Sequence, residues 1–256
     1  MISNVKYKRG QVTIFIILGI LIVFAIIGYF LISNKPYSQI SPKENPQAYI
    51  EECIKDSVYQ SSEKVFSIGG TLSADKTTLY NKTNIRFLCY TEENKQLCTT
   101  EDPVMKRTME DSIQSDSIND VKKCFETLKK TFSNYEYTEG DLNYTVEILP
   151  TTIKATAKKE ITISQDEQTQ KFNVFISDEY SPAYNFILIT NQILRDELDC
   201  QCGQISCTSD LTLLSQVNLG FRLGLDITPR TERIYTIQDR TTNQEFKFAV
   251  RNCVII

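Results

Sequence analysis

An uncharged apolar run near the N-terminus constrains this chain more than any other feature of its sequence. Residues 12–32 read VTIFIILGILIVFAIIGYFLI, which is 21 residues without a charged side chain. A helix of that length spans about 31 Å, roughly the thickness of the hydrocarbon core of a bilayer. Helices of soluble proteins keep a polar face, and this run has none. The sequence therefore predicts one transmembrane helix, with the lipid bilayer as its partner.

The charges that flank this run predict its orientation. Three basic residues lie within residues 1–11, whereas only Lys35 follows the run closely. By the positive-inside rule, residues 1–11 form a cytoplasmic segment and the bulk of the chain lies outside the cell. The run is too long for an ordinary secretory signal and no Ala-x-Ala site follows it, so we expect a retained signal anchor. Residues 33–45 contain two prolines and many polar side chains, which is typical of a linker.

The junction before the apolar run reads Lys8-Arg9-Gly10-Gln11. It resembles the class III signal of archaeal type IV pilins, in which a prepilin peptidase cuts on the cytoplasmic side of the helix. Glutamine is common there as the first mature residue, so the resemblance implies cleavage between Gly10 and Gln11. Phe15 stands at the fifth mature position, where bacterial pilins carry a glutamate that pairs with the neighbouring subunit. The resemblance therefore implies processing more than assembly into a filament.

The whole chain also resembles a set of single-pass surface proteins of small-genome archaea that have no established activity. The resemblance is carried by the start RGQVTIFIILGI, by a helix from Glu52-Cys53 to Gly69-Gly70, and by a helical segment over residues 121–124 that strands follow. It implies a location in the cell membrane and a general layout, and it implies no activity.

All eight cysteines follow the apolar run. An even number on the exported side of a membrane favours disulfide bonds. Cys89 and Cys98 flank a polar stretch that can turn, so we expect them to link a hairpin. Cys53 and Cys124 lie on the apolar faces of two predicted helices, and we expect them to join these helices. The remaining candidates are Cys253 and one partner from the group Cys200, Cys202 and Cys207.

The segment CQCGQISC, residues 200–207, has a second interpretation. Three thiolates at this spacing are able to ligate zinc or part of an iron–sulfur cluster, with Cys253 as a fourth ligand. An oxidising compartment, a chain without histidine and the lack of a Cys-x-x-Cys pair favour disulfides instead. We therefore expect no metal and no cofactor.

Two further marks fit an exported domain. Asn81 and Asn143 each begin an Asn-x-Thr tripeptide, which matches the acceptor pattern for N-glycosylation. Both asparagines are therefore predicted to lie on the surface as candidate glycan sites.

Helix-start signals occur at three places, each a polar residue followed by proline: Asn45-Pro46, Asp102-Pro103 and Ser181-Pro182. Such pairs supply an N-cap and a preset first turn. The first helix is expected to stop at Gly69-Gly70. The second carries an apolar stripe that is expected to face the core, made of Ile118, Val121, Phe125, Leu128 and Phe132.

Alternation of apolar and polar residues predicts half-buried antiparallel strands over much of the remaining chain. A hairpin loop is expected at residues 164–170, and a polar turn near residues 241–244. The sum is an α+β extracellular domain of helices packed on antiparallel sheets, with a first part over residues 46–180 and a second over residues 181–256. The alternating residues are Tyr144, Val146 and Ile148, then Ile153, Ala155 and Ala157, then Phe172, Val174 and Ile176, and finally every second residue from Val217 to Ile227.

Composition and motifs argue against several function classes. The net charge of −4 and the isoelectric point near 5.2 give no electrostatic case for nucleic-acid binding. The lack of histidine removes Ser-His-Asp and Cys-His catalysis, and no phosphate-binding loop or hydrolase motif is present. The acidic runs at Glu51-Glu52 and at Asp196, Glu197 and Asp199 are expected to face water on helices. We therefore predict no catalytic residue and no enzyme.

The aromatic residues offer a different clue. Tyr180 and Tyr184 bracket the third helix start, and Tyr135 and Tyr137 lie together in SNYEYTEG. Clustered tyrosines serve in recognition, or they pack at the edge of a core. Both interpretations are compatible with the sequence.

The sequence thus favours a structural or interaction protein of the cell surface, pilin-like or adhesin-like, which associates with itself or with other surface proteins. The alternative is a membrane-tethered binding or sensor module for an extracytoplasmic ligand. A sizeable apolar pocket with converging polar groups would distinguish this module from a flat structural surface. An extracytoplasmic enzyme is the least favoured class.

Overall fold

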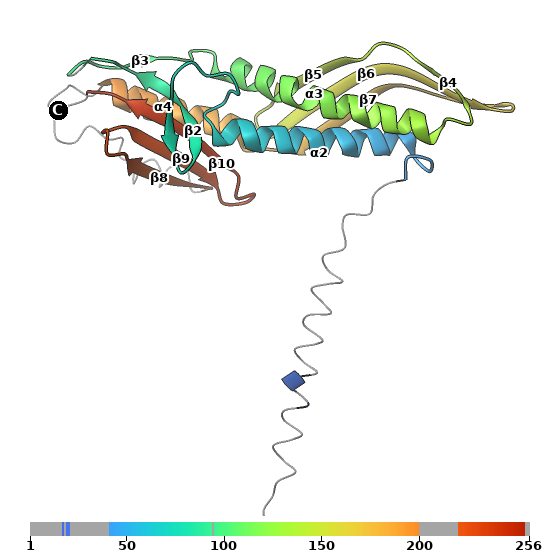
Figure 1. Ribbon diagram of the computed structural model, residues 1–256, viewed down its shortest axis with the longest axis horizontal. Coiled ribbons are helices and arrows are strands. Elements are labelled where there is room, and N and C mark those ends of the chain that lie inside the picture. Colours follow the sequence, from blue (N-terminus) through green and yellow to red (C-terminus); the bar gives the residue numbers. More distant parts are fainter. Residues whose placement is uncertain (1–16, 18, 21–40, 94, 200–219, 254–256) are drawn as a thin grey trace, which may run out of the picture. The chain divides into compact units, whose positions relative to one another are not determined.

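The computed structural model describes residues 17, 19–20, 41–93, 95–199 and 220–253. The chain divides into two compact units, residues 1–41 and residues 42–256, and the second contains helices α2 to α4 and strands β1 to β10 (Figure 1). This unit is of the α+β class.

Most of the predicted transmembrane segment, residues 12–32, lies outside the described residues, as do Gly10 and Gln11. Within the described part of the chain, no helix combines the length and the apolar character that crossing a membrane requires. The transmembrane helix at residues 12–32 and the cleavage site between Gly10 and Gln11 therefore remain predictions.

Helix α2 spans Pro46–Ser67. The Asn45 side chain accepts a hydrogen bond from the Ala48 backbone N–H at 3.0 Å, which confirms the predicted helix start. The helix ends before Gly69 and Gly70, whose φ angles are +93° and +90°. These left-handed conformations favour glycine, so the two glycines end the helix as the sequence predicts.

Helix α3 spans Met105–Thr131 and begins two residues later than Asp102-Pro103 indicated. Its N-cap residue, Val104, makes no side-chain cap hydrogen bond. The Asp102 carboxylate instead accepts hydrogen bonds from the Val104 backbone N–H at 3.2 Å and from the Thr108 hydroxyl at 3.0 Å. It also lies 2.9 Å from the Arg86 guanidinium, so this carboxylate connects the start of α3 to a neighbouring strand.

A mixed sheet occupies one part of the unit. In spatial order it contains β1 (Thr77–Tyr80), β2 (Thr83–Tyr90), β10 (Glu245–Arg251), β9 (Arg233–Asp239) and β8 (Phe221–Ile227), with β3 (Thr99–Thr100) beside β2. The pair β2–β10 is parallel and the other pairs are antiparallel. The expectation of purely antiparallel sheets is therefore wrong for this sheet, because the last strand inserts between β2 and β9.

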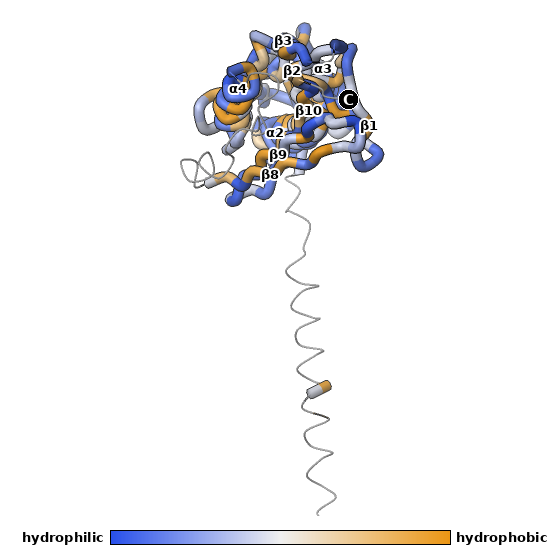
Figure 2. The backbone as a smooth tube through the Cα atoms, turned by 90° about the vertical axis from the view of Figure 1, so that its left-hand side faces the viewer, coloured by the Kyte–Doolittle hydropathy of each residue, from blue (hydrophilic) through white to orange (hydrophobic). Residues whose placement is uncertain are grey.

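One hydrophobic core joins the two parts that the sequence suggested. Helix α4 (Ala183–Asp199) places the Phe186 ring 5.4 Å from the Phe66 ring of α2 and 5.9 Å from the Phe246 ring of β10. The apolar segments of α4 and β9 stand out in orange in Figure 2. Elements from before and after Pro182 thus share one core. The stripe predicted for the second helix lies in the same core, with Val121, Phe125, Leu128 and Phe132 buried and Ile118 partly buried.

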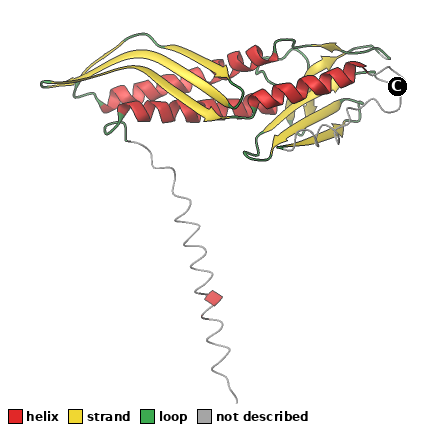
Figure 3. Ribbon diagram, turned by 180° about the vertical axis from the view of Figure 1, so that it is seen from behind, coloured by secondary structure: helices red, strands yellow, loops and turns green. Residues whose placement is uncertain are grey.

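A second sheet is antiparallel and contains β4 (Glu136–Glu139), β5 (Asn143–Ile148), β6 (Thr152–Gln165) and β7 (Gln168–Tyr180). Strand β6 is long enough to pair with β5 and then β4 along one side, and it pairs with β7 along the other. Figure 3 shows α2 and α3 lying against one face of this sheet. The helix pair buries the apolar face of the sheet, which is the α+β packing expected from the sequence.

Helix α2 also covers the outer edge of β7. The Gln47 side-chain amide donates a hydrogen bond to the Val174 carbonyl at 3.0 Å. The Ile176 backbone N–H donates to Glu51 Oε1 at 3.3 Å. These side chains occupy edge positions at which another strand would otherwise pair.

Two expectations for the β6–β7 hairpin are wrong. Pairing continues to Gln165 and Gln168, so residues 166–167 alone form the turn in place of the longer loop expected at residues 164–170. The sequence also placed Ile176 on the buried face of β7, but Phe175 is the residue that is buried there. It pairs with the buried Ala157 of β6. The neighbouring Ile176 is consequently turned outward and is 43% exposed.

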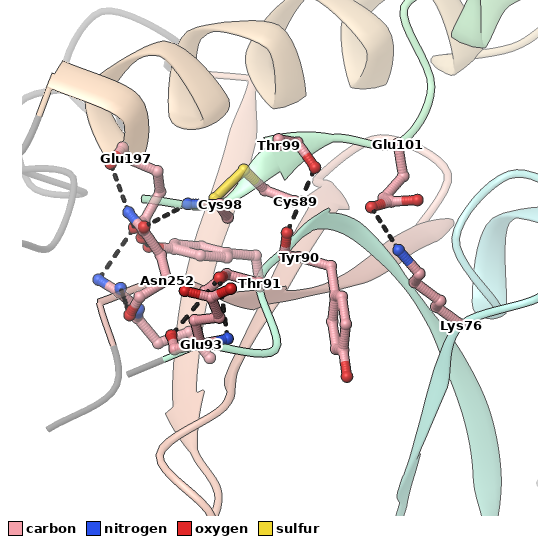
Figure 4. The surroundings of a disulfide bond; sticks show 12 residues. Lys76, Cys89, Tyr90, Thr91, Glu93, Cys98, Thr99, Glu101, Glu197 and Asn252 are labelled. Carbon is pink, nitrogen blue, oxygen red and sulfur yellow. Dashed lines mark hydrogen bonds and ion pairs between the residues drawn. A yellow bond between two sulfur atoms is a disulfide. The ribbon is translucent and has the colours of Figure 1, made fainter. Parts of the chain in front are cut away.

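Disulfides link the elements at two places among the described residues. Cys53 of α2 bonds to Cys124 of α3, with a Cα–Cα distance of 6.1 Å. Cys89 of β2 bonds to Cys98 just before β3, with a Cα–Cα distance of 5.3 Å (Figure 4). Both pairs match those expected from the sequence. Cys253 is also disulfide-bonded, and its expected partners Cys200, Cys202 and Cys207 lie outside the described residues.

Candidate functional site

A buried polar cluster lies where α4, β9 and the C-terminal segment meet (Figure 4). The Glu197 side chain is fully buried and accepts a hydrogen bond from the Tyr235 hydroxyl. Its other carboxylate oxygen lies 3.0 Å from the Arg233 guanidinium. The expectation that Glu197 faces water is therefore wrong, because Arg233 on β9 supplies a buried partner that the local sequence does not reveal. Its neighbours Asp196 and Asp199 are partly or fully exposed.

Asn252 extends this cluster to the disulfide loop. Its amide donates a hydrogen bond to the Glu197 backbone carbonyl at 2.6 Å, and its Oδ1 accepts one from the Cys98 backbone N–H at 2.9 Å. Burial raises the pKa of Glu197, and the nearby Arg233 opposes this effect. Every one of these groups is bonded within the protein, so the cluster holds the fold together and offers nothing to a ligand.

A groove of about 330 Å³ lies on another part of the surface, between α2, the ends of β6 and β7, and the turn from β9 to β10. We call it the tyrosine groove, because Tyr59 and Tyr180 both line it. Its volume falls at the lower end of the range of small-ligand sites. The lining residues are Lys55, Asp56, Val58, Tyr59, Ser62, Ile153, Ser177, Glu179, Tyr180, Ser181, Thr242 and Gln244.

The two tyrosines form the exposed rim of the tyrosine groove. Tyr59 on α2 is 54% exposed and Tyr180 at the end of β7 is 51% exposed. Partial burial, followed by the charge of Asp239, raises the pKa of Tyr180, so its hydroxyl stays protonated at neutral pH. The rim therefore presents two aromatic rings to solvent.

Gln244 lines the tyrosine groove and is almost fully buried. The residue is 3% exposed, and its side-chain oxygen Oε1 is buried without a hydrogen-bond partner. Most buried polar atoms in folded proteins are paired, and leaving one unpaired costs about 1–3 kcal/mol. An unpaired acceptor on a residue that lines a groove is therefore a candidate partner for a hydrogen-bond donor of a ligand.

The turn that carries Gln244 is held by its own hydrogen bonds. The Thr242 backbone N–H and hydroxyl both donate to the Asp239 carboxylate at 2.7 Å. The Gln244 backbone N–H donates to the Thr242 hydroxyl oxygen at 3.2 Å, and the Gln244 carbonyl accepts from the Asp239 backbone N–H at 2.9 Å. The polar turn predicted near residues 241–244 is thus confirmed, and its hydrogen bonds fix the backbone of Gln244.

Charge in the tyrosine groove is close to balanced. Lys55 lies 3.1 Å from Glu179 and 3.7 Å from Glu52. Among the described residues of the lining it is the one cation, and it stands against the carboxylates of Asp56 and Glu179. The groove is therefore slightly acidic, and it offers no cluster of cations to an anion.

A second, more open groove of about 580 Å³ lies beside the start of α3. Its charged side chains pair along the helix, as Lys106 does with Glu110 at 2.9 Å. Of the described residues that have a buried and unpartnered polar atom, none lines this groove. We therefore take the tyrosine groove as the candidate site.

The tyrosines that the sequence analysis named lie in different places in the structure. Tyr180 lies in the groove, whereas Tyr184 packs against the core and the Tyr135 ring packs 5.1 Å from Phe132. No local sequence pattern indicates Tyr59 or Gln244 as residues of this site, because a helix and a distant turn come together there only in the fold.

The other candidate residues lie elsewhere. Asn81 stands in the exposed turn between β1 and β2, and Asn143 is exposed at the start of β5. Of the described residues, no group of three or more cysteine, aspartate or glutamate side chains is placed to hold a metal ion. The CQCGQISC segment, for which a metal was the second interpretation, lies outside the described residues.

Comparison of the chain with protein-family models, with curated proteins and with solved structures found no match. The function must therefore be argued from the geometry of the site.

Proposed function

We propose that this protein is a membrane-anchored extracellular interaction protein, adhesin-like, that binds a ligand in the tyrosine groove. The predicted anchor at residues 12–32 supports the location. The disulfides Cys53–Cys124 and Cys89–Cys98 support it as well, because such bonds persist in oxidising compartments. Partners are surface components of the same or a neighbouring cell.

The observation that carries the proposal is the unpaired side-chain oxygen of Gln244, a residue that lines a groove together with two exposed tyrosines. A concave site with apolar surface and a few converging polar groups is the usual form of a ligand site. A purely structural, pilin-like subunit requires a surface that packs against its neighbours, and it does not require a ligand site. The groove therefore favours ligand recognition, which was the alternative that the sequence left open.

The location is tested with a membrane-impermeant amine label on intact cells. Lysines of residues 42–256 should be labelled before lysis, and intact mass should report whether the chain begins at Met1 or at Gln11. Labelling that appears only after lysis would contradict an extracellular domain.

The binding role is tested with the full chain in phospholipid nanodiscs and with isolated envelopes of the cells that make the protein. The double variant Tyr59→Ala/Tyr180→Ala should bind the envelopes at least tenfold more weakly than the wild type. Leu188→Ala is the matched control, because Leu188 is 50% exposed on α4 and does not line the groove. Equal binding by all three proteins would sink the proposal.

A further inference from the structure

Several polar side chains of the tyrosine groove are able to accept a hydrogen bond from a ligand. The Ser62 hydroxyl donates its hydrogen to the Tyr59 carbonyl at 2.8 Å. The Thr242 hydroxyl donates its hydrogen to Asp239 at 2.7 Å. Both hydroxyls are therefore limited to accepting a hydrogen bond from a ligand, as are the Gln244 oxygen and the two carboxylates of the lining, whereas the tyrosine hydroxyls both donate and accept. The groove thus fits a ligand that is rich in hydrogen-bond donors.

Charge argues against anionic ligands. The single cation of the described lining, Lys55, already lies within ion-pair distance of Glu52 and Glu179. A phosphate or sulfate group would meet the carboxylate of Asp56 as well. Sites for such groups rely on arginine clusters or helix N-termini, and α2 lines this groove with its middle turns.

Two other ligand classes fit poorly. A quaternary ammonium would stack on the tyrosines, but it has no hydrogen to donate and would leave Gln244 Oε1 unpaired. An extended peptide would bind by adding a strand to a sheet edge. Next to the groove, the edge of β7 is already bonded to α2 at two places, where the Val174 carbonyl accepts from Gln47 and the Ile176 N–H donates to Glu51.

We propose that the tyrosine groove binds a neutral, hydroxyl-rich saccharide, whose ring stacks on Tyr59 or Tyr180 and whose hydroxyl donates to Gln244 Oε1. The inference rests on the proposed function, since it names the ligand class of the same groove. A sugar ring combines an apolar face with many hydroxyl groups, which matches the two tyrosine rings, the hydrogen-bond acceptors of the lining and its near-neutral charge. A glycan of the cell envelope is the natural source of such a ligand.

Direct binding is measured by calorimetry with the full chain in phospholipid nanodiscs, because alkyl glycoside detergents would occupy the groove. The probes are neutral disaccharides and trisaccharides of glucose, mannose, galactose and N-acetylglucosamine, with inorganic phosphate and choline for comparison. We expect groove-dependent binding of at least one saccharide. Groove-dependent binding of phosphate or choline without any saccharide would overturn the inference.

Variants separate recognition from folding. Tyr59→Ala and Tyr180→Ala should each weaken saccharide binding severalfold, whereas Tyr59→Phe and Tyr180→Phe keep the ring and should stay within about threefold of the wild type. Gln244→Met removes the acceptor at similar volume and should weaken binding about tenfold. The same variant should unfold at an unchanged or higher temperature, because the lost oxygen has no partner in the free protein. Unchanged saccharide binding by Gln244→Met would overturn the role of this residue.

Envelope binding distinguishes failure of this inference from failure of the proposed function. Periodate treatment of the envelopes cleaves vicinal diols of sugars, and we expect it to abolish the binding that depends on Tyr59 and Tyr180. Binding that depends on both tyrosines but survives periodate would overturn the saccharide while leaving the groove as a ligand site. Envelope binding that does not depend on Tyr59 and Tyr180 would overturn the proposed function itself.

Discussion

Glu110 on α3 accepts a hydrogen bond at 2.8 Å from the backbone N–H of Ile148 on β5. Two residues away, the Val146 N–H donates to Gln114 on the same helix at 3.3 Å. The α3 side chains therefore close this edge of the four-stranded sheet, as α2 closes the edge at β7. An uncovered edge strand is a template for pairing with another chain, so the helix pair protects the sheet as well as burying its face.

The first prediction concerns this edge. Glu110→Ala should lower the free energy of unfolding by about 1–3 kcal/mol, because the N–H of the buried Ile148 loses its acceptor. Glu110→Gln keeps an oxygen at the same place and loses only the ion pair with Lys106, which contributes about 0.5 kcal/mol. Urea denaturation of both variants checks the difference. Equal losses would show that the backbone hydrogen bond contributes little.

The features predicted well from the sequence are those with local causes. The Asn45 cap and the glycines after Ser67 act within a few residues, so their pattern is legible in the chain. The disulfide Cys53–Cys124 could also be predicted from the sequence, because each cysteine lies on the apolar face of its helix and two such faces meet in a core.

The features that the sequence did not reveal depend on distant partners. Glu197 belongs to an acidic run that is typical of a solvated helix face. It is nevertheless buried and forms an ion pair with Arg233, which lies on β9, far from it in the sequence. The tyrosine groove joins Tyr59 to Gln244, which are far apart in the chain, and no local pattern marks either residue. Tertiary contacts of this kind override local composition, which is why the fold class was easier to predict than the site.

The second prediction concerns the disulfides. The Cys53–Cys124 bond closes a loop with a sequence separation of 71, and Cys89–Cys98 closes one of 9. In the chain-entropy description the longer loop contributes about 4 kcal/mol and the shorter about 2.5 kcal/mol. Replacing both cysteines of a pair by alanine should therefore destabilise the protein more for Cys53–Cys124. Guanidinium denaturation of the two double variants checks the order, and a reversed order would contradict this account.

The third prediction concerns pH. Burial raises the pKa of Glu197 in the fold above its usual value of 4.5. Its contribution to stability is therefore fully present below pH 4.5 and is lost as the pH rises through the raised value. The stability advantage of the wild type over Glu197→Gln should fall as the pH rises in this window, measured by urea denaturation at a series of pH values.

Asp116 supplies a control of opposite sign. Burial acts to raise its pKa, but hydrogen bonds from Lys64 and Ser61 outweigh burial and hold the pKa below 3.8. Its contribution is therefore present above pH 3.8 and is lost as the pH falls through the lowered value. The advantage of the wild type over Asp116→Asn should rise with pH in this region. Parallel pH profiles for the two variants would contradict both assignments.

The last prediction concerns the end of α2. A Cβ on Gly69 would lie 2.7 Å from the Arg86 Cβ, at a φ of +93° that side chains rarely adopt. Gly69→Ala should therefore lower the free energy of unfolding by about 1–3 kcal/mol, through backbone strain and through displacement of the Arg86 side chain from Asp102. Gly140→Ala is the matched control, because its φ is outside the left-handed region and its Cβ would meet Glu160 at an ordinary 3.6 Å. A loss for Gly140→Ala as large as that for Gly69→Ala would show that strain at the helix end is not the cause.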